Sequence, residues 1–234
     1  MPSPMLNVEH EGQIATLTMN RPGKRNAMCE ELLEAIDEFY SAPPKDVRVV
    51  ILTGTEGHYC SGLDLSEHVR RSAEDNLYHS RAWHKVMEKI QFGGLISVSA
   101  MFGAVIGGGL ELASATHVRI AEPSTIFQLP EGRRGIFVGG GATAHVGRLL
   151  GADRMTEMML TGRKYNADEG LALGLAHYSV GEGEAMPLAQ KLAGKISRNA
   201  PLSNYLMVQS IARINDMSQS DGLFVESLAA ALSQ

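Results

Sequence analysis

Gly-Gly-Gly-Leu-Glu-Leu-Ala occupies residues 107–113, and this stretch gives the clearest indication of the fold. The three glycines predict a tight turn, and Leu110 to Ala115 follow it as an apolar helical segment. Glycine-rich turns before helices let a backbone approach a ligand and direct its N–H groups toward it. Glu111 falls in the first helical turn, where the helix dipole stabilises a carboxylate. The stretch therefore predicts a strand–turn–helix unit beside a ligand site.

Strands and helices alternate on both sides of this unit. We predict a hairpin with one buried face at residues 6–19, strands at 47–53, 96–104 and 118–120, and helices at 30–40, 142–150 and 154–160. The β-branched run 47–53 is continuous, which is typical of a strand covered on both faces. From about residue 184 the pattern is helical to the end. The whole predicts an α/β core with an α-helical tail.

Composition excludes several classes of protein. The chain has 234 residues, 44% of them hydrophobic, so it can bury a core without disulfides or a metal. Its net charge of −5 argues against a nucleic-acid partner. Cys29 and Cys60 form no CxxC pair, so we expect neither a disulfide framework nor a metal site. There is no apolar run long enough for a membrane span and no secretory signal, so we expect a cytoplasmic protein.

Familiar ligand motifs do not fit the glycine clusters. Residues 107–109 lack the later glycine of GxGxxG, and no P-loop or GxSxG sequence occurs. A second carboxylate, Glu131, lies twenty positions after Glu111 and also adjoins a glycine. Two such carboxylates could serve as an acid/base pair tuned by burial and by each other. The alternative is that both are ordinary structural or surface glutamates.

Five motifs in order resemble the crotonase (enoyl-CoA hydratase/isomerase) superfamily. They are Asn20-Arg21-Pro22 with Asn26-Ala27, Cys60-Ser61-Gly62-Leu63-Asp64-Leu65, the 107–113 stretch, Pro130-Glu131 and Gly139-Gly140-Gly141. The resemblance runs from about residue 6 to 230. It implies a crotonase-like superhelix of ββα units with an α-helical C-terminal region. Residues 1–183 would be the core with the CoA-thioester site, and 184–234 a helical region that is short for the family.

The resemblance also implies a reaction and its residues. The substrate would be an acyl-CoA thioester, and the enzyme an enoyl-CoA hydratase, a hydro-lyase that adds water across the C2=C3 bond. The backbone N–H groups of Leu63 and Gly108 would form the oxyanion hole for the enolate. Glu111 would activate water, and Glu131 would supply the proton to C2. No cofactor is implied, because coenzyme A is part of the substrate, and the assembly would be a homotrimer or a dimer of trimers.

Further positions carry over as substrate- or CoA-binding residues: Lys24, Arg25, Ala27, Ser61, Gly62, Asp64, Leu65 and Gly107. Lys24 or Arg25 would lie near the nucleotide phosphates, and the alternative is a solvated loop charge. For Asp64 we expect a structural hydrogen bond to the neighbouring turn rather than proton transfer.

Several residues depart from the family pattern. His117 replaces a common aspartate, and we expect a buried, hydrogen-bonded histidine rather than a catalytic one. Arg133 and Arg134 follow Glu131, and two nearby cations predict a lowered pKa for that carboxyl. His68, His79 and His84 share helical spacing with Trp83 and Met87, which favours a partly buried helix over a metal site.

Three functions remain open. The presence of both Glu111 and Glu131 favours hydration over branches that keep a single carboxylate. A second possibility is another crotonase-type reaction, either double-bond isomerisation or cleavage of a carbon–carbon or thioester bond. A third is a non-catalytic CoA-binding member that keeps the fold.

Overall fold

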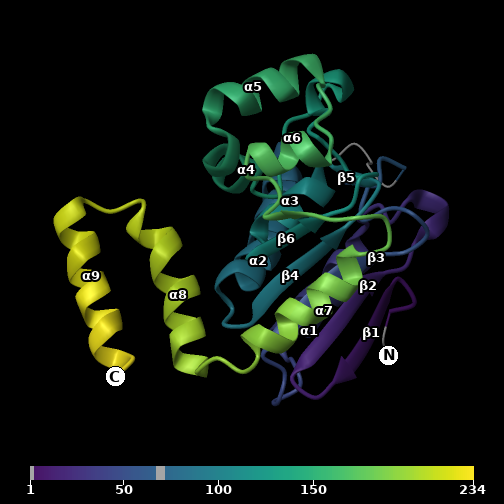
Figure 1. Ribbon diagram of the computed structural model, residues 1–234. Helices are drawn as coiled ribbons and strands as arrows, with labels where there is room; N and C mark the ends of the chain where they lie inside the picture. Colours follow the sequence, from purple (N-terminus) through teal and green to yellow (C-terminus); the bar gives the residue numbers. More distant parts are fainter. Residues whose placement is uncertain (1–2, 67–71) are drawn as a thin grey trace.

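The computed structural model describes residues 3–66 and 72–234 and has an α/β core from which the last two helices project (Figure 1). The main sheet has the strand order β1-β2-β3-β4-β6-β8. Its strands are β1 (Leu6–Glu11), β2 (Ile14–Met19), β3 (Val49–Gly54), β4 (Ile96–Met101), β6 (Val118–Ala121) and β8 (Tyr178–Ser179). Only β1 and β2 pair antiparallel; every other pair in this sheet is parallel. A small second sheet pairs β5 (Ala104–Ile106) with β7 (Ile126–Gln128).

Some helices begin at residues that suit a helix N-terminus. Ser72 with Asp75, and Asn166 with Glu169, form capping boxes, and Pro201 occupies the first turn of its helix. The helices are α1 (Glu30–Ser41), α2 (Ala73–Phe92), α3 (Gly108–Ala115), α4 (Ala142–Leu150), α5 (Ala152–Thr161), α6 (Ala167–Ala172), α7 (Ala185–Ile196), α8 (Pro201–Ile214) and α9 (Gln219–Leu232). Two short 3-10 turns, η1 (Pro22–Lys24) and η2 (Glu131–Arg134), lie beside the site described below.

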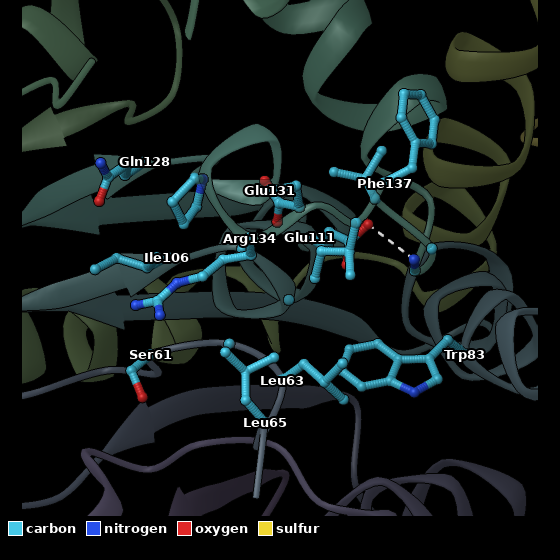
Figure 2. Close-up of a pocket in the computed structure, with 18 of the residues that line it drawn as sticks. Ser61, Leu63, Leu65, Trp83, Ile106, Glu111, Gln128, Glu131, Arg134 and Phe137 are labelled. Carbon is cyan, nitrogen blue, oxygen red and sulfur yellow. Dashed lines mark hydrogen bonds between the residues drawn. The ribbon is translucent and has the colours of Figure 1, made fainter. Parts of the chain in front are cut away.

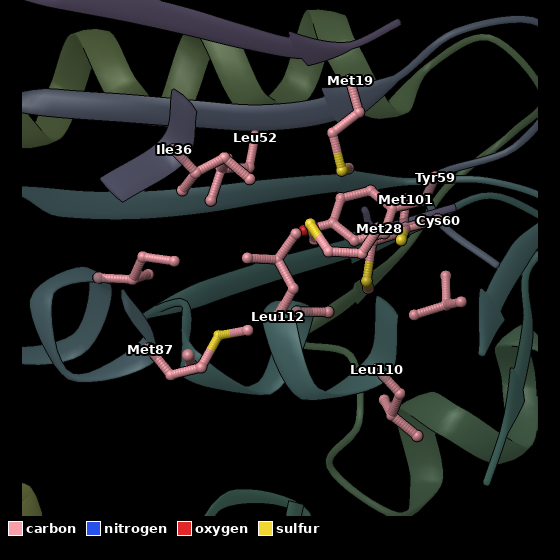
Figure 3. Close-up of a cluster of buried hydrophobic side chains, with 14 of the residues drawn as sticks. Met19, Met28, Ile36, Leu52, Tyr59, Cys60, Met87, Met101, Leu110 and Leu112 are labelled. Carbon is pink, nitrogen blue, oxygen red and sulfur yellow. The ribbon is translucent and has the colours of Figure 1, made fainter. Parts of the chain in front are cut away.

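Strand β3 is buried on both faces, as its β-branched run predicts. Val50 and Leu52 pack with side chains of α1 and α3 in the larger apolar cluster, part of which is drawn in Figure 3. Val49 and Ile51 face the opposite way and join the alanines of α7 in a second cluster. The sheet therefore separates two apolar layers, and the α/β prediction is confirmed.

The sheet brings two glycine turns together. Cys60, in the loop after β3, makes a parallel bridge to Val105 in β5, and Met28 bridges to Leu63 in the same way. Both turns follow the carboxyl ends of parallel strands, which is where open α/β sheets commonly bind ligands. The turn at 61–63 thus comes to lie against the turn at 107–108.

The structure differs from the sequence predictions at three places. The predicted strand 96–104 is split into β4 and β5, which belong to different sheets. Gly103 makes the turn between them at φ +56, and a Cβ there would lie 2.0 Å from the Gly57 carbonyl oxygen. Strand β1 is exposed along nearly its whole length, so the buried face of the hairpin is confined to β2. Helix α6, β7 and β8 have no counterpart in the prediction.

The C-terminal region is helical, as predicted, but it is divided into three helices. Helix α7 packs on the sheet, whereas α8 and α9 form a hairpin that projects to one side (Figure 1). The domain division at residue 184 stays a prediction. Among the residues that the structure describes, no helix combines the length and the apolar character needed to cross a membrane.

Candidate active site

Two backbone amides lie close together where the glycine turns meet. The Gly62 carbonyl accepts a hydrogen bond from the Met28 amide at 2.7 Å, and the Asp64 amide donates to the Met28 carbonyl at 2.9 Å. The Leu63 amide belongs to the same trans peptide as the Gly62 carbonyl, so its N–H points away from Met28. A Cβ on Gly108 would lie 3.5 Å from the Leu63 nitrogen. Neither the Leu63 nor the Gly108 amide has an acceptor in the described part of the chain.

Both turns need glycine for their close approach. Gly62 has φ +91, and a Cβ there would lie 2.6 Å from the Ile106 carbonyl oxygen and 3.1 Å from the Gly108 nitrogen. Gly107 has φ +51 and precedes the first residue of α3. The Gly108 amide therefore belongs to a helix N-terminus, where N–H groups lack partners in the helix and attract negative charge.

Glu111 is held in the first turn of the wholly buried helix α3. One of its carboxylate oxygens accepts hydrogen bonds from the Gly140 amide at 2.8 Å and the Ala142 amide at 3.1 Å. Only 4% of the residue is exposed. Burial raises the pKa of Glu111, and the amide donors oppose that effect because they stabilise the ionised form.

Glu131 lies at the start of η2, and its carboxylate is less well hydrogen-bonded than that of Glu111. Its Oε2 atom is buried and has no hydrogen-bond partner among the residues that the structure describes. A Cβ on Gly107 would lie 2.9 Å from its Oε1 atom, so the carboxyl adjoins the glycine turn at 107–108. Burial, and secondarily the charge of Glu111, raises the pKa of Glu131 to about 7.

The predicted effect of the two arginines on Glu131 is wrong, since the pKa of this carboxyl is raised and not lowered. The Arg133 guanidinium donates to the Thr161 carbonyl at the end of α5. Arg134 points away from Glu131, toward the side of the cavity with Ser61 and Ile106 (Figure 2). Adjacency in sequence therefore does not bring either cation to the carboxylate.

A single cavity of about 950 Å³ contains both carboxyls and both amides (Figure 2). Ten of the predicted residues line it: Glu111, Glu131, Leu63, Gly108, Lys24, Arg25, Ser61, Gly62, Leu65 and Gly107. Ala27 and Asp64 are not among its lining residues. The glycine turns, the two acids and the basic 24–25 loop thus meet in one place, although they come from distant parts of the chain.

Asp64 has a structural environment. It accepts hydrogen bonds from Arg21 at 2.9 Å and from the Ser66 hydroxyl at 2.7 Å, and only 5% of it is exposed. The Ser66 hydroxyl and then the Arg21 guanidinium lower the pKa of Asp64 to about 2. The same guanidinium donates to the Ala27 carbonyl. Asp64 and Ala27 therefore brace the turn below the cavity.

The histidines differ in their surroundings. His117 accepts from the Ser97 amide at 2.9 Å, and its other ring nitrogen lies 2.9 Å from the Gln91 carbonyl oxygen. It is hydrogen-bonded as expected, but half-buried rather than fully buried. His79 and His84 lie on α2, whereas His68 lies outside the described residues. In the described ranges, no group of three or more His, Cys, Asp or Glu side chains could hold a metal ion.

Sequence reasoning missed part of the site. It noted Gly139-Gly140-Gly141 as a motif but not that the Gly140 amide binds Glu111. It placed Trp83 on a helix face, whereas the buried indole also forms a cavity wall between Gly108 and Gly140. Arg134, Phe137 and Lys164 are among the other lining residues. No local pattern marks these residues, because their role depends on contacts between elements far apart in sequence.

Comparisons with known proteins show which family the chain is similar to. Residues 9–226 match the family "Enoyl-CoA hydratase/isomerase". The chain is 34% identical over 228 residues to enoyl-CoA hydratase domain-containing protein 2, mitochondrial, of Bos taurus, covering 93% of this chain and 76% of that one. It is 32% identical over 209 residues to the short-chain-enoyl-CoA hydratase of Clostridium acetobutylicum, covering 88% and 80%.

A solved structure also matches closely. It is the crystal structure of a Rhodopseudomonas palustris protein proposed to be an enoyl-CoA hydratase, with a TM-score of 0.96 and 43% sequence identity. The match covers 98% of this chain and 89% of that one. Sequence and fold thus agree along nearly the whole length. The chain belongs to the enoyl-CoA hydratase/isomerase family, and its fold is that of the crotonase superfamily.

Proposed function

We propose that the protein is an enoyl-CoA hydratase that adds water across the C2=C3 bond of a 2-enoyl-CoA thioester. The observation that carries this proposal is that two carboxyls, Glu111 and Glu131, share one cavity with two amides that have no acceptor among the described residues. Amides directed at the thioester oxygen stabilise the charge that develops there in the transition state. A carboxyl on each side of the reacting carbons can move the two protons that hydration requires.

The surroundings of the two carboxyls support different roles. Burial raises the pKa of Glu111, which makes it a stronger base, and its two amide hydrogen bonds orient the carboxylate and oppose that rise, so we assign it as the base that takes a proton from water. Within the described ranges, Glu131 has no such donor on Oε2, and burial raises its pKa to about 7, so at neutral pH it can hold a proton to give.

The reaction then balances in atoms and electrons. The water oxygen bonds to C3 while its proton moves to Glu111, and the C2=C3 π electrons shift toward the thioester, forming an enolate held by the Leu63 and Gly108 amides. The enolate collapses as C2 takes the proton from Glu131. Proton exchange between the acids and solvent restores both. No redox cofactor or metal enters this scheme, and coenzyme A enters only as part of the substrate.

The test is an assay with crotonyl-CoA and with longer and aromatic enoyl thioesters. Hydration removes the enoyl-thioester absorbance and gives a product heavier by one water molecule. A product of unchanged mass with a shifted double bond would identify an isomerase instead. CoA-ester binding without turnover, or turnover unaffected by Glu111→Gln and Glu131→Gln, would contradict the hydratase proposal.

Assembly as a homotrimer or a dimer of trimers is part of the same proposal. Helices α8 and α9 project from the core (Figure 1) and carry exposed apolar side chains, among them Tyr205, Ile211, Phe224 and Leu228. Contiguous exposed apolar surface is typical of a protein interface. Light scattering coupled to size-exclusion chromatography gives the mass of the assembly, and a monomer at micromolar concentration would contradict this proposal.

A further inference from the structure

We propose that Ser80 is a positioning residue for Glu111, acting through the peptide that joins Gly139 to Gly140. Ser80 lies within α2, and its hydroxyl donates to the Gly139 carbonyl at 2.6 Å. Serine within a helix often bonds instead to a carbonyl of its own preceding turn. Here the hydroxyl reaches to another segment of the chain, 59 residues away.

The Gly139 carbonyl and the Gly140 amide are the two ends of one peptide unit. The structure has no cis peptide among its described residues, so this unit is trans. In a planar trans peptide the C=O and N–H bonds point in opposite directions. A donor on the carbonyl therefore fixes where the amide points, and this amide points to the Glu111 carboxylate at 2.8 Å. Ser80 holds one end of the peptide, and Glu111 accepts from the other.

Glycine on both sides makes this peptide easy to rotate. A Cβ on Gly140 would lie 2.7 Å from Glu111 Oε2 and 2.8 Å from Trp83 Cε3, so the close packing excludes a side chain at this position. Glycine, in turn, restricts the backbone least of all residues. A flipped peptide would turn a carbonyl oxygen toward the Glu111 carboxylate in place of an N–H group. The hydroxyl of Ser80 opposes that flip, and it also polarises the peptide so that the amide is a stronger donor.

Other ionisable groups face this region and stay in place in every variant below. Glu131 faces Glu111 from η2, His79 and His84 lie on α2, and His145 lies on α4. The His84 ring nitrogen lies 3.5 Å from the Ser80 oxygen. A Cβ on Gly141 would lie 3.0 Å from His145 and 4.0 Å from His84. Because these groups are present in every variant, a difference in the Glu111 titration between the variants reports on the Ser80 hydroxyl.

The experiment compares Ser80→Ala with Ser80→Thr, which keeps the hydroxyl. Ser227→Ala is the matched control, because Ser227 also donates to a carbonyl, that of Leu223 in its own helix at 2.9 Å, and does not line the cavity. The first measurement is a carbon NMR titration of free protein labelled in its glutamate carboxyls, with Glu111→Gln identifying the signal. We expect the pKa of Glu111 to rise in Ser80→Ala and to return to the wild-type value in Ser80→Thr.

The second measurement rests on the function proposed above. With an enoyl-CoA substrate, we expect kcat of Ser80→Ala to fall on the order of 10-fold with little change in KM, since a misdirected catalytic group slows the chemical step. The acid limb of the kcat profile should move to higher pH, and Ser80→Thr should restore both. If the wild-type protein has no turnover, the hydratase proposal fails, while the titration still decides on Ser80. An unchanged Glu111 titration in Ser80→Ala, or the same change in Ser80→Thr and Ser227→Ala, would overturn the role of Ser80.

Discussion

Glu111 and Glu131 share one cavity but lie in contrasting surroundings. Glu111 is carried by the buried helix α3 and accepts hydrogen bonds from two amides of the loop before α4. Glu131 starts a 3-10 turn, and its buried Oε2 atom has no partner in the described part of the chain. The two residues are almost equally shielded from water, with 4% and 6% exposed. The amide donors to Glu111 are therefore the clearest difference between their surroundings.

In the proposed reaction, this contrast lets one fold obtain a base and an acid from the same kind of side chain. Desolvation disfavours the charge on both carboxyls, and neighbouring carboxylates disfavour a second charge. In the proposed reaction, the amide donors favour Glu111 as the member of the pair that carries the charge. Each prediction below changes one member of the pair or its support, in order of decreasing expected effect.

The largest effect is expected from removing the base. Glu111→Gln keeps the size of the side chain but cannot accept a proton, so kcat should fall by about 10²–10⁴-fold with crotonyl-CoA. Binding of a CoA ester should change little, as measured by calorimetry. A variant that keeps a tenth or more of the wild-type kcat would show that Glu111 is not the base.

Gly140→Ala should disturb the support of Glu111 without removing the carboxyl. The new Cβ would lie 2.7 Å from Glu111 Oε2 and 2.8 Å from Trp83, so one of them must shift. We expect kcat to fall about 10²-fold, the cost of a displacement near 1 Å in an active site. Gly194→Ala is the control, since a Cβ there meets nothing within 4 Å. Equal activities of the two variants would refute this account of the loop.

Glu131→Gln should change stability in a pH-dependent way. The folded-state pKa of Glu131 is raised from 4.5 to about 7, so the native protein binds this proton more tightly than the unfolded chain does. The resulting stability is fully present below pH 4.5 and is lost as the pH rises to about 7. Glutamine does not ionise and suffers no such loss. Relative to wild type, the variant should therefore gain about 3 kcal/mol between pH 4 and pH 8.

Urea unfolding at pH 4, 6 and 8 measures this gain. The gain should grow between pH 4 and 7 and then level off. A difference in unfolding free energy that stays constant over the whole range would mean that Glu131 titrates normally in the folded protein. Glu111→Gln, measured in the same way, would sharpen the comparison by reporting on the better-supported carboxyl.

The smallest effect is expected at Arg133. Its guanidinium donates to the Thr161 carbonyl at the end of α5, where a cation favours the helix dipole. Arg133→Ala should lower the free energy of unfolding by about 1 kcal/mol and leave the titration of Glu131 unchanged. Chemical denaturation and carboxyl NMR test the two parts. A rise in the pKa of Glu131 in this variant would mean that Arg133 does act on the acid.

The sequence predicted much of this arrangement because parts of it are local. The glycine turn and the helix at 107–113 follow from residues that are neighbours in the chain, and so does the place of Glu111 in the first turn. The buried strand β3 follows from an unbroken β-branched run. Family motifs pointed to Glu131 and to the Leu63 and Gly108 amides, and all three residues line the cavity.

Contacts between distant segments account for what was missed. The pattern at 96–104 reads as one strand, but Gly103 turns the chain because it packs against the Gly57 carbonyl. The two arginines beside Glu131 in the sequence predicted a lowered pKa, but this pKa is raised. The Arg133 guanidinium instead donates to the Thr161 carbonyl at the end of α5, 28 residues after Arg133. The donors to Glu111 come from 29 and 31 residues further along the chain. Such partners are set by packing and leave no mark on local periodicity.

The main-chain origin of the Leu63 and Gly108 amides has a consequence for anyone who wishes to dissect the site. Replacing a side chain leaves its own N–H group in place, so an alanine scan would pass over these donors at position 63 and would report mainly steric disturbance at 108, where a Cβ would strike Trp83. Semi-synthesis that exchanges one amide link for an ester would delete a single N–H group and keep the side chain, and it would also weaken the carbonyl of that link as an acceptor, which at position 63 is the Gly62 carbonyl bonded to the Met28 amide. That backbone edit is the means of weighing each donor separately.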